Sequence, residues 1–168
     1  MALGPQGKVQ ILTICTGNIC RSPMAEALLK KKIGPKLAKY VHVASAGTHA
    51  MEGMPASHTG IATAVKMNVD LSLHSSQPLT PYLIGRSDII LAMEPEHVKI
   101  VLRLAPTAGP RTFLLKEFGM PKGYNPQGSI IDDPIAQSDE FYDRVYKELD
   151  AEIDRIIPYL KKVVASAI

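Results

Sequence analysis

The sequence contains no tryptophan and only two cysteines, Cys15 and Cys20. Two cysteines in 168 residues do not make the disulfide framework of a small secreted protein, so a reducing cytoplasm is the expected location. No apolar run approaches the ~20 residues that a membrane-spanning helix requires, and the first residues lack the pattern of a signal peptide. We therefore expect a cytoplasmic globular protein.

Charge of one sign is not in large excess either. The net charge is +3, which is too small to indicate a nucleic acid or a membrane as partner. Aromatic residues make up 5% of the chain, too few for the ring sandwich of a flavin carrier, and no other cofactor is expected. The histidines are scattered without zinc-ligand spacing, so no metal is expected; they are His42, His49, His58, His74 and His97. No repeat or linker divides the sequence, which predicts one domain at residues 9–168 after a flexible tail at residues 1–8.

Short apolar runs alternate with helix-like stretches along the chain. The runs are rich in Val, Ile and Leu, which is typical of strands covered on both faces. They are residues 9–14, 41–44, 88–93 and 112–115. This alternation predicts an α/β fold with a parallel sheet, in which ligands bind beyond the carboxyl ends of the strands.

Proline marks most of the expected helix boundaries, because its missing amide costs nothing in the first helical turn. The starts are Ser22-Pro23, Thr80-Pro81 and Glu94-Pro95, and Gly34-Pro35 marks an end. A final helix is expected to begin near Ser138, with a kink or break at Pro158. One apolar stripe runs along it, formed by Phe141, Val145, Leu149, Ile153, Ile156 and Leu160.

The stretch CTGNICRS, residues 15–22, follows the first expected strand directly. A tight loop that leads into a helix presents backbone amides to one point, and the helix dipole adds positive potential. Gly17 and Asn18 readily adopt the positive φ that curls such a loop, and Arg21 can hold two oxygens of a dianion. A thiol in that field, Cys15, ionises more easily. The loop is therefore suited to bind a phosphoryl-like oxyanion and to attack it.

Two other interpretations apply to this stretch. A cysteine at the end of a buried strand is often only a packing residue, and an arginine six positions later is a weak signal by itself. A nucleotide-binding loop is excluded, because the Gly-Lys-Ser/Thr ending is absent. The preceding strand and the Ser22-Pro23 helix start favour the oxyanion site.

The sequence resembles the low-molecular-weight protein tyrosine phosphatase family. VQILTICTGNICRSPMAEALL carries the family's Cys-x5-Arg-Ser signature, and SAGT, SDIILAME and YNPQGSIIDDP followed by FYDRVYKEL are similar to further family blocks. The likeness extends from about residue 9 to about residue 160. It implies a single-domain three-layer sandwich, flavodoxin-like or Rossmann-like, with a four-stranded parallel sheet in the order 2-1-3-4.

The resemblance implies a role for each site residue. Cys15 would be the nucleophile that forms a phosphocysteine, Arg21 would hold the phosphoryl oxygens, and Asp133 would act as general acid and then general base. Asp132 is the alternative acid, but the family's acid directly precedes proline. The phosphate-binding loop would comprise Thr16, Gly17, Asn18, Ile19, Cys20, Arg21 and Ser22.

A supporting network behind the loop is also implied by the resemblance. Ser22 would donate its hydroxyl to the thiolate, and Asn18, Ser45 and His74 would fix the shape of the loop. Cys20 would be able to trap Cys15 as a reversible disulfide under oxidation. The alternative for Cys20 is a small residue that only fills space in the loop.

The expected pocket walls depart from the tyrosine-specific pattern. Members that act on phosphotyrosine usually place aromatic rings where this chain has Met51, Ile135 and Ala136. DPIAQS and LKEF are similar to the protein-arginine phosphatase branch, but that branch tends to have threonine at Ile19. We expect a phosphotyrosine phosphatase, with phosphoarginine as the alternative.

The expected partners are a phosphorylated protein or peptide as substrate and inorganic phosphate as product, with the enzyme a monomer. Two further functions stay open. One is arsenate reduction with external thiols. The form that passes a disulfide through two further cysteines after the loop is excluded, because Cys15 and Cys20 both lie inside the loop and the sequence has no other cysteine. The other is a non-catalytic phosphoprotein-binding module, which would be expected to lose the nucleophile or the acid.

Overall fold

The computed structural model describes residues 7–121, 124 and 128–168, so most of the expected tail at residues 1–8 and part of YNPQGSIIDDP lie outside the described residues. Four parallel strands form one sheet: β1 (Val9–Cys15), β2 (Val41–Gly47), β3 (Ile89–Ala92) and β4 (Thr112–Leu114). Their order, β2-β1-β3-β4, confirms the expected 2-1-3-4 topology. The strand expected at residues 41–44 is three residues longer, reaching Gly47, where it pairs with Cys15.

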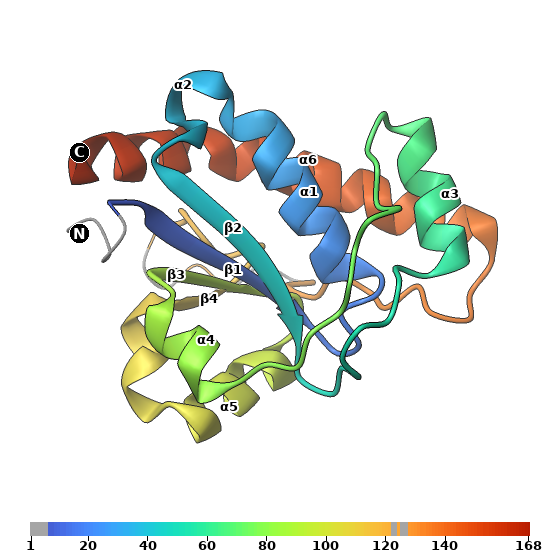
Figure 1. Ribbon diagram of the computed structural model, residues 1–168, viewed down its shortest axis with the longest axis horizontal. Helices are drawn as coiled ribbons and strands as arrows, with labels where there is room; N and C mark the ends of the chain where they lie inside the picture. Colours follow the sequence, from blue (N-terminus) through green and yellow to red (C-terminus); the bar gives the residue numbers. More distant parts are fainter. Residues whose placement is uncertain (1–6, 122–123, 125–127) are drawn as a thin grey trace.

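Helices cover both faces of the sheet and make three layers (Figure 1). One face carries α1 (Arg21–Ile33) and α6 (Asp139–Ala167), and the other carries α4 (Pro81–Arg86) and α5 (Pro95–Leu104). The remaining elements are α2 (Pro35–Ala38), α3 (His58–Lys66) and a 3-10 helix, η1 (Pro106–Arg111). No helix in the described part of the chain is both long and apolar enough to cross a membrane.

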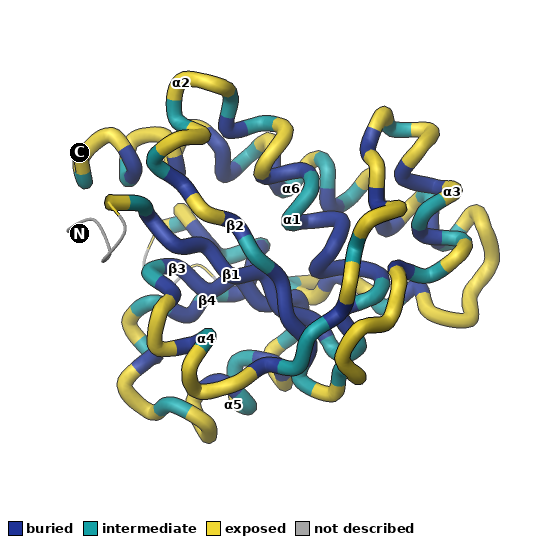
Figure 2. Tube along the Cα trace, viewed as in Figure 1, coloured by how far each residue is buried: buried dark blue, intermediate teal, exposed yellow. Residues whose placement is uncertain are grey.

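Side chains of β1 alternate between two apolar cores. Val9 and Ile11 face α1 and α6, whereas Leu12 and Ile14 face α4 and α5. Both faces of the strand are therefore buried, as Figure 2 shows for the centre of the sheet. Because β1 has β2 on one side and β3 on the other, the loop that follows Cys15 emerges where the connections diverge to opposite sides of the sheet.

The proline signals located the end of α1 and the starts of α4 and α5 correctly, and α6 begins directly after Ser138 as expected. Two other expectations were wrong. Ser22 is not the N-cap of α1, because the helix begins at Arg21 and the Ser22 hydroxyl is bound elsewhere. At Pro158 a kink or a break was expected; the break is wrong, because α6 continues to Ala167, and the kink stays a prediction. The buried side chains around Pro158, such as Ile157 and Leu160, offset the hydrogen bond that proline removes.

Candidate active site

The loop between β1 and α1 turns its carbonyl groups outward. Each outer carbonyl accepts a hydrogen bond from another segment: Thr48 N to Cys15 O (2.9 Å), His49 N to Thr16 O (2.9 Å), His74 Nε2 to Asn18 O (2.6 Å), Ser57 N to Ile19 O (2.8 Å) and Tyr146 Oη to Cys20 O (3.0 Å). In the described part of the chain, the amides of residues 16–20 donate no backbone hydrogen bond. These amides are thus the free donors of the loop, and they can converge on an oxyanion.

Asn18 fixes the curvature of the loop. Its φ of 55° lies in the left-handed region, which asparagine tolerates better than most residues. Its side-chain amide donates to Ser22 Oγ (2.8 Å) and Ser45 Oγ (2.9 Å), and its Oδ1 accepts from Gln77 N (2.9 Å). His74 must carry a proton on Nε2, because the Asn18 carbonyl can only accept. The four residues expected in the supporting network are therefore brought together.

Cys15 is buried and its Sγ lies 3.0 Å from Ser22 Oγ. Because Ser22 Oγ already accepts from Asn18, its own proton can be donated to a thiolate at Cys15, with Ala46 O at 3.4 Å as the alternative acceptor. The same contacts explain why Ser22 does not cap α1. Its hydroxyl faces back toward the strand end instead of toward the first turn of the helix.

Arg21 is the most enclosed charged side chain of the site, with 1% exposure. Its Nη1 bonds to Glu94 and to Ile131 O (2.9 Å), and its Nη2 lies 3.0 Å from Asp133 Oδ2. Its Nε is buried without a partner among the described residues, although buried polar groups are normally hydrogen-bonded. Glu94 thus anchors the guanidinium at Nη1. Nε is free to bind an anion, whereas at Nη2 an anion would have to replace Asp133.

The two neighbouring carboxylates, Asp132 and Asp133, have different surroundings. Asp133 lines the cavity above Cys15 and contacts Arg21. Asp132 pairs with Arg144 at 3.1 Å, and both side chains of that pair are 53% exposed. Only Asp133 is within reach of a group bound in the loop.

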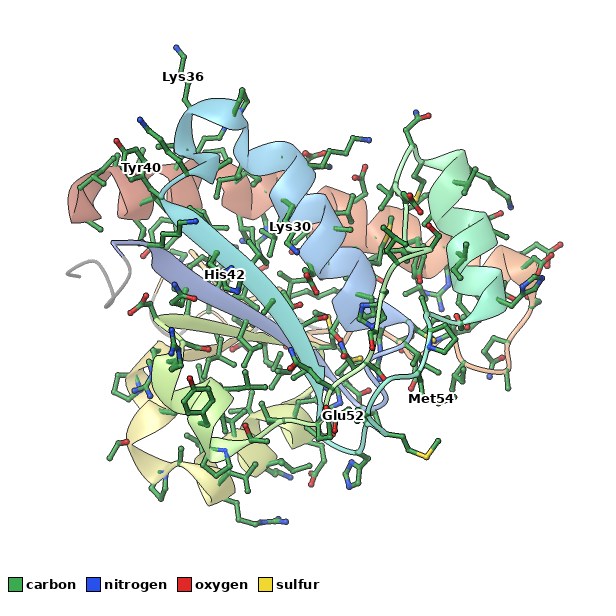
Figure 3. The ribbon with its side chains drawn as sticks, viewed as in Figure 1. Lys30, Lys36, Tyr40, His42, Glu52 and Met54 are labelled. Carbon is green, nitrogen blue, oxygen red and sulfur yellow. The ribbon has the colours of Figure 1, made fainter. Side chains whose placement is uncertain are left out.

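The cavity over the loop has a volume of about 220 Å³. It is lined by Cys15, Thr16, Gly17, Ile19, Cys20, Arg21, Asp133 and Ile135. Met51 and Ala136, expected as wall residues, are outside this lining. Met51 is 67% exposed on the loop after β2, the loop that carries Glu52 and Met54 in Figure 3. Ala136 has a φ of 58°, an uncommon conformation for a non-glycine residue.

Cys20 shares the cavity but has its own partners. Its Sγ lies 3.3 Å from Tyr142 Oη and 3.5 Å from Ser57 Oγ, and burial raises the pKa of its thiol. Both cysteines are free thiols. A reversible Cys15–Cys20 disulfide therefore stays a prediction, and the raised pKa makes Cys20 a weaker nucleophile at neutral pH than an ordinary exposed thiol.

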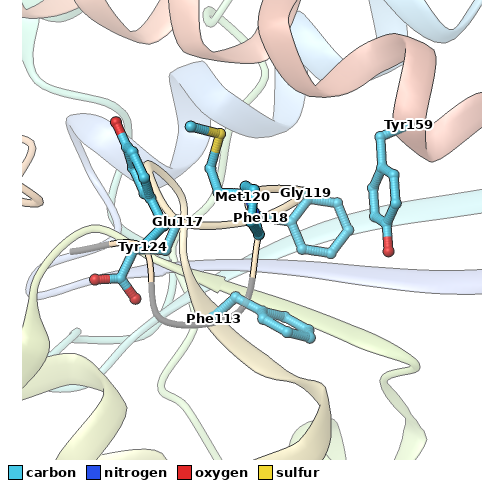
Figure 4. A pocket seen from close by; sticks show the side chains of 8 residues that line it. Phe113, Glu117, Phe118, Gly119, Met120, Tyr124 and Tyr159 are labelled. Carbon is cyan, nitrogen blue, oxygen red and sulfur yellow. The ribbon is translucent and has the colours of Figure 1, made fainter. Parts of the chain in front are cut away.

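A larger cavity of about 570 Å³ lies on another part of the surface (Figure 4). Its walls are mostly apolar and aromatic and include Phe113, Phe118 and Tyr159. Its lining, as far as the structure describes it, contains no cysteine, histidine or arginine. Volume therefore does not identify the reactive site, whereas the convergence of a thiol, a guanidinium and a carboxylate does.

Three positions at the site were not found from the sequence. Glu94 anchors Arg21, Glu26 Oε2 accepts from Ser45 Oγ (2.5 Å), and His97 contacts Thr16. Glu94 lies inside the SDIILAME block, two residues after the end of β3, so its place at the carboxyl edge of the sheet was a usable signal. The other two lie on helices that carry no sign of the contact.

Gly47, from SAGT, supports the loop by leaving space for it. A Cβ at this position would lie 2.5 Å from Thr16 O and 2.9 Å from Asn18 N, both backbone atoms that cannot move aside independently. We predict that Gly47→Ala displaces the loop and lowers the rate of any reaction at this site by about 10²-fold, the cost of a shift of about 1 Å in reacting groups. Gly85→Ala is the matched control, because a Cβ there meets nothing within 4 Å. Equal activity of the two variants would contradict the close packing.

The known proteins that this chain resembles are phosphatases of one family. A family model described as low molecular weight phosphotyrosine protein phosphatase matches residues 10–166. The chain is 36% identical over 140 residues to the low molecular weight protein-tyrosine-phosphatase Etp of Escherichia coli, covering 83% of this chain and 86% of Etp. It is 32% identical over 154 residues to the protein-arginine-phosphatase of Bacillus subtilis, covering 92% and 98%.

Among solved structures, the YwlE arginine phosphatase from Geobacillus stearothermophilus superimposes with a TM-score of 0.82. The two sequences are 34% identical, and the match covers 95% of this chain and 97% of that one. The similarity therefore extends over the whole fold and includes the loop, the carboxylate segment and the last helix.

Proposed function

Because the chain belongs to the low molecular weight phosphotyrosine protein phosphatase family, we propose that it hydrolyses phosphotyrosine in proteins with Cys15, Arg21 and Asp133 as its catalytic residues. The chain is a hydrolase of this family, and the assignment of substrate and residue roles is the proposal. One observation carries it. Cys15, Arg21 and Asp133 come from β1, from the start of α1 and from the segment before α6, and all three line one cavity of about 220 Å³.

The proposed reaction has two steps. The phosphate dianion of the substrate accepts hydrogen bonds from the loop amides and from Arg21, which displaces Asp133 from Nη2. The Cys15 thiolate then attacks phosphorus, the bond to the leaving oxygen breaks, and Asp133 donates a proton to that oxygen. In the second step Asp133 removes a proton from water, the water oxygen attacks phosphorus, and inorganic phosphate leaves with the Cys15 thiolate restored.

The walls of the cavity support an aryl substrate. Ile19 and Ile135 line its sides, so a phenyl ring next to the phosphate would pack against alkyl groups. Asp133 contacts Arg21 from the same rim and would lie beside the ester oxygen. No aromatic residue is among the described residues that line the cavity, so ring stacking from them does not contribute.

Phosphoarginine is the second candidate. It is supported by the similarity to the arginine phosphatases of Bacillus subtilis and Geobacillus stearothermophilus over nearly the whole chain. A second carboxylate near the site, Glu94, is 30% exposed and would favour a cationic leaving group. The apolar Ile19 and Ile135 favour the tyrosine substrate instead.

The test uses two peptides of one sequence that carry either phosphotyrosine or phosphoarginine, with arsenate plus thiol as a third substrate. We expect kcat/KM for phosphotyrosine to exceed that for phosphoarginine by at least about tenfold, the effect of burying part of a ring against two isoleucines. Ile19→Thr should reduce the ratio, because it removes alkyl surface from the wall. A higher value for phosphoarginine would make the second candidate the function, and turnover of arsenate alone would exclude both.

We also propose that the enzyme acts as a monomer in the cytoplasm. A reducing compartment is needed because only a free thiol at Cys15 can ionise and attack. Analytical ultracentrifugation with and without reductant tests this proposal. A stable dimer under reducing conditions would contradict the monomer.

A further inference from the structure

His97 is a buried titratable residue that the proposed mechanism does not use. It lies in the first turn of α5, is 2% exposed, and its Nε2 is 2.9 Å from Thr16 Oγ1. Its Nδ1 is buried and has no partner in the described part of the chain. Thr16 follows the nucleophile directly and lines the cavity. We therefore ask what a buried imidazole that contacts the Thr16 hydroxyl does at this site.

The unpaired Nδ1 decides which ring nitrogen carries the proton. Burial first, and then the charge of Arg21, lower the pKa of His97 to about 4, against the opposing effects of Glu94 and Asp133. The ring is therefore neutral at neutral pH, with one proton. A buried N–H without an acceptor is more costly than a bare nitrogen, so the proton belongs on Nε2, where it is donated to Thr16 Oγ1.

This tautomer determines where the Thr16 hydroxyl points. Thr16 Oγ1 accepts from His97 Nε2 and also lies 3.4 Å from Arg21 Nη2, a second donor. The two donors occupy the two lone pairs of the oxygen, so its own hydrogen must be directed to a third group. Since Thr16 lines the cavity over Cys15, that hydrogen faces the place where a phosphoryl oxygen would be held.

We propose that the Thr16 hydroxyl is an additional hydrogen-bond donor to the phosphoryl oxygens, and that His97 is the positioning residue that directs it. The inference rests on the proposed phosphatase function and deepens it. In the opposite tautomer Thr16 would donate to His97 and would present only lone pairs to the anion. His97 therefore determines whether this side chain attracts the substrate or repels it.

Thr16→Val tests the donor, because valine keeps the shape of threonine without the hydroxyl. The probes are inorganic phosphate and orthovanadate as competitive inhibitors of aryl phosphate hydrolysis. We expect their inhibition constants to rise about 10- to 100-fold, the effect of one hydrogen bond to a charged group, and Thr16→Ser to stay within about threefold of wild type. Thr112→Val is the matched control, since it removes a buried hydroxyl in β4 that donates to Ala108 O. Inhibition constants for Thr16→Val within twofold of wild type would overturn the proposal.

Variants of His97 test the positioning role. His97→Leu should weaken phosphate binding about as much as Thr16→Val. The double variant should bind phosphate no more weakly than either single variant, because both substitutions remove the same donor, the Thr16 hydroxyl. His97→Gln should restore most of the affinity, since the glutamine amide can donate from nearly the same place as Nε2. Losses that add in the double variant, or no rescue by glutamine, would contradict a role through Thr16.

Nitrogen-15 NMR of the histidine rings in the wild-type protein gives a readout that needs no variant to fold. The expected signature for His97 is a protonated Nε2 and a bare Nδ1 at pH 7, and a protonated Nδ1 would overturn the proposal. The two hypotheses fail separately. A wild-type enzyme that releases no phosphate from aryl phosphates would refute the proposed function, whereas an active enzyme with unchanged anion affinity in Thr16→Val would refute only this inference.

Discussion

Cys15→Ser is expected to lower kcat for phosphotyrosine peptide by about 10⁴-fold or more, the usual result when a covalent nucleophile is removed. A serine hydroxyl is a far weaker acid than a thiol and needs a general base to attack. Among the described residues the Cys15 side chain makes its one hydrogen-bond contact with Ser22 Oγ, which cannot serve as that base. The change is nearly isosteric, so the loop and Arg21 should keep their places. Phosphate release measured under saturating substrate checks the prediction.

Cys20→Ser is the matched control for this experiment. Cys20 is the second thiol in the cavity, but its Sγ contacts Tyr142 and Ser57, and burial raises its pKa. We expect Cys20→Ser to retain at least about a tenth of the wild-type kcat, since it alters packing and not bond formation. Turnover that survives Cys15→Ser, or that disappears in Cys20→Ser alone, would show that Cys15 is not the nucleophile.

Asp133→Asn has the second largest expected effect, and that effect depends on the leaving group. For phenyl phosphate, whose phenoxide is a poor leaving group, we expect kcat to fall by about 10²- to 10⁴-fold, because the departing oxygen must be protonated. For para-nitrophenyl phosphate, whose leaving group is stable as an anion, the loss should be less than about tenfold. The ratio of the two losses, measured at saturation, isolates proton donation from binding.

Asp132→Asn is the control for the acid. Asp132 pairs with Arg144 on the surface, and an exposed pair of this kind contributes little, about 0–1 kcal/mol to stability. The variant should hydrolyse both aryl phosphates at close to the wild-type rate. Equal losses on the two substrates in Asp133→Asn, or a leaving-group effect in Asp132→Asn, would move the acid role to another residue.

Local signals in the sequence predicted most of the fold. Thr80 and Ser138 are N-caps whose hydroxyls accept from Leu83 N and Phe141 N, and both were found from the capping residue and the pattern after it. Signals that compete with tertiary packing were less reliable. Pro158 does not break α6, because the buried side chains around it hold the helix in place. The helix α3 was not found because its buried residues, Gly60, Thr63 and Ala64, are small or polar and form no apolar stripe.

The residues of the site were also predictable from the sequence only where the signal is local. The loop from Cys15 to Ser22 is a contiguous motif, so its affinity for an oxyanion could be inferred from residue type and spacing. The role of Asp133 came from the family resemblance, in which the acid directly precedes proline. Glu94 and His97 act on that loop from 73 and 81 residues away, and only the parallel pairing of β1 with β3 brings them there. Such contacts depend on the folded chain and leave no periodic signal in the sequence.

The most direct test of the account is to trap the covalent intermediate. Enzyme mixed with excess para-nitrophenyl phosphate is quenched within milliseconds, digested, and analysed by mass spectrometry, with Asp133→Asn used to slow attack by water. The account predicts one phosphate on the peptide that contains Cys15, attached to that sulfur, and none in Cys15→Ser. A rapid burst of para-nitrophenol without a phosphorylated Cys15, or phosphate carried by another residue, would contradict it.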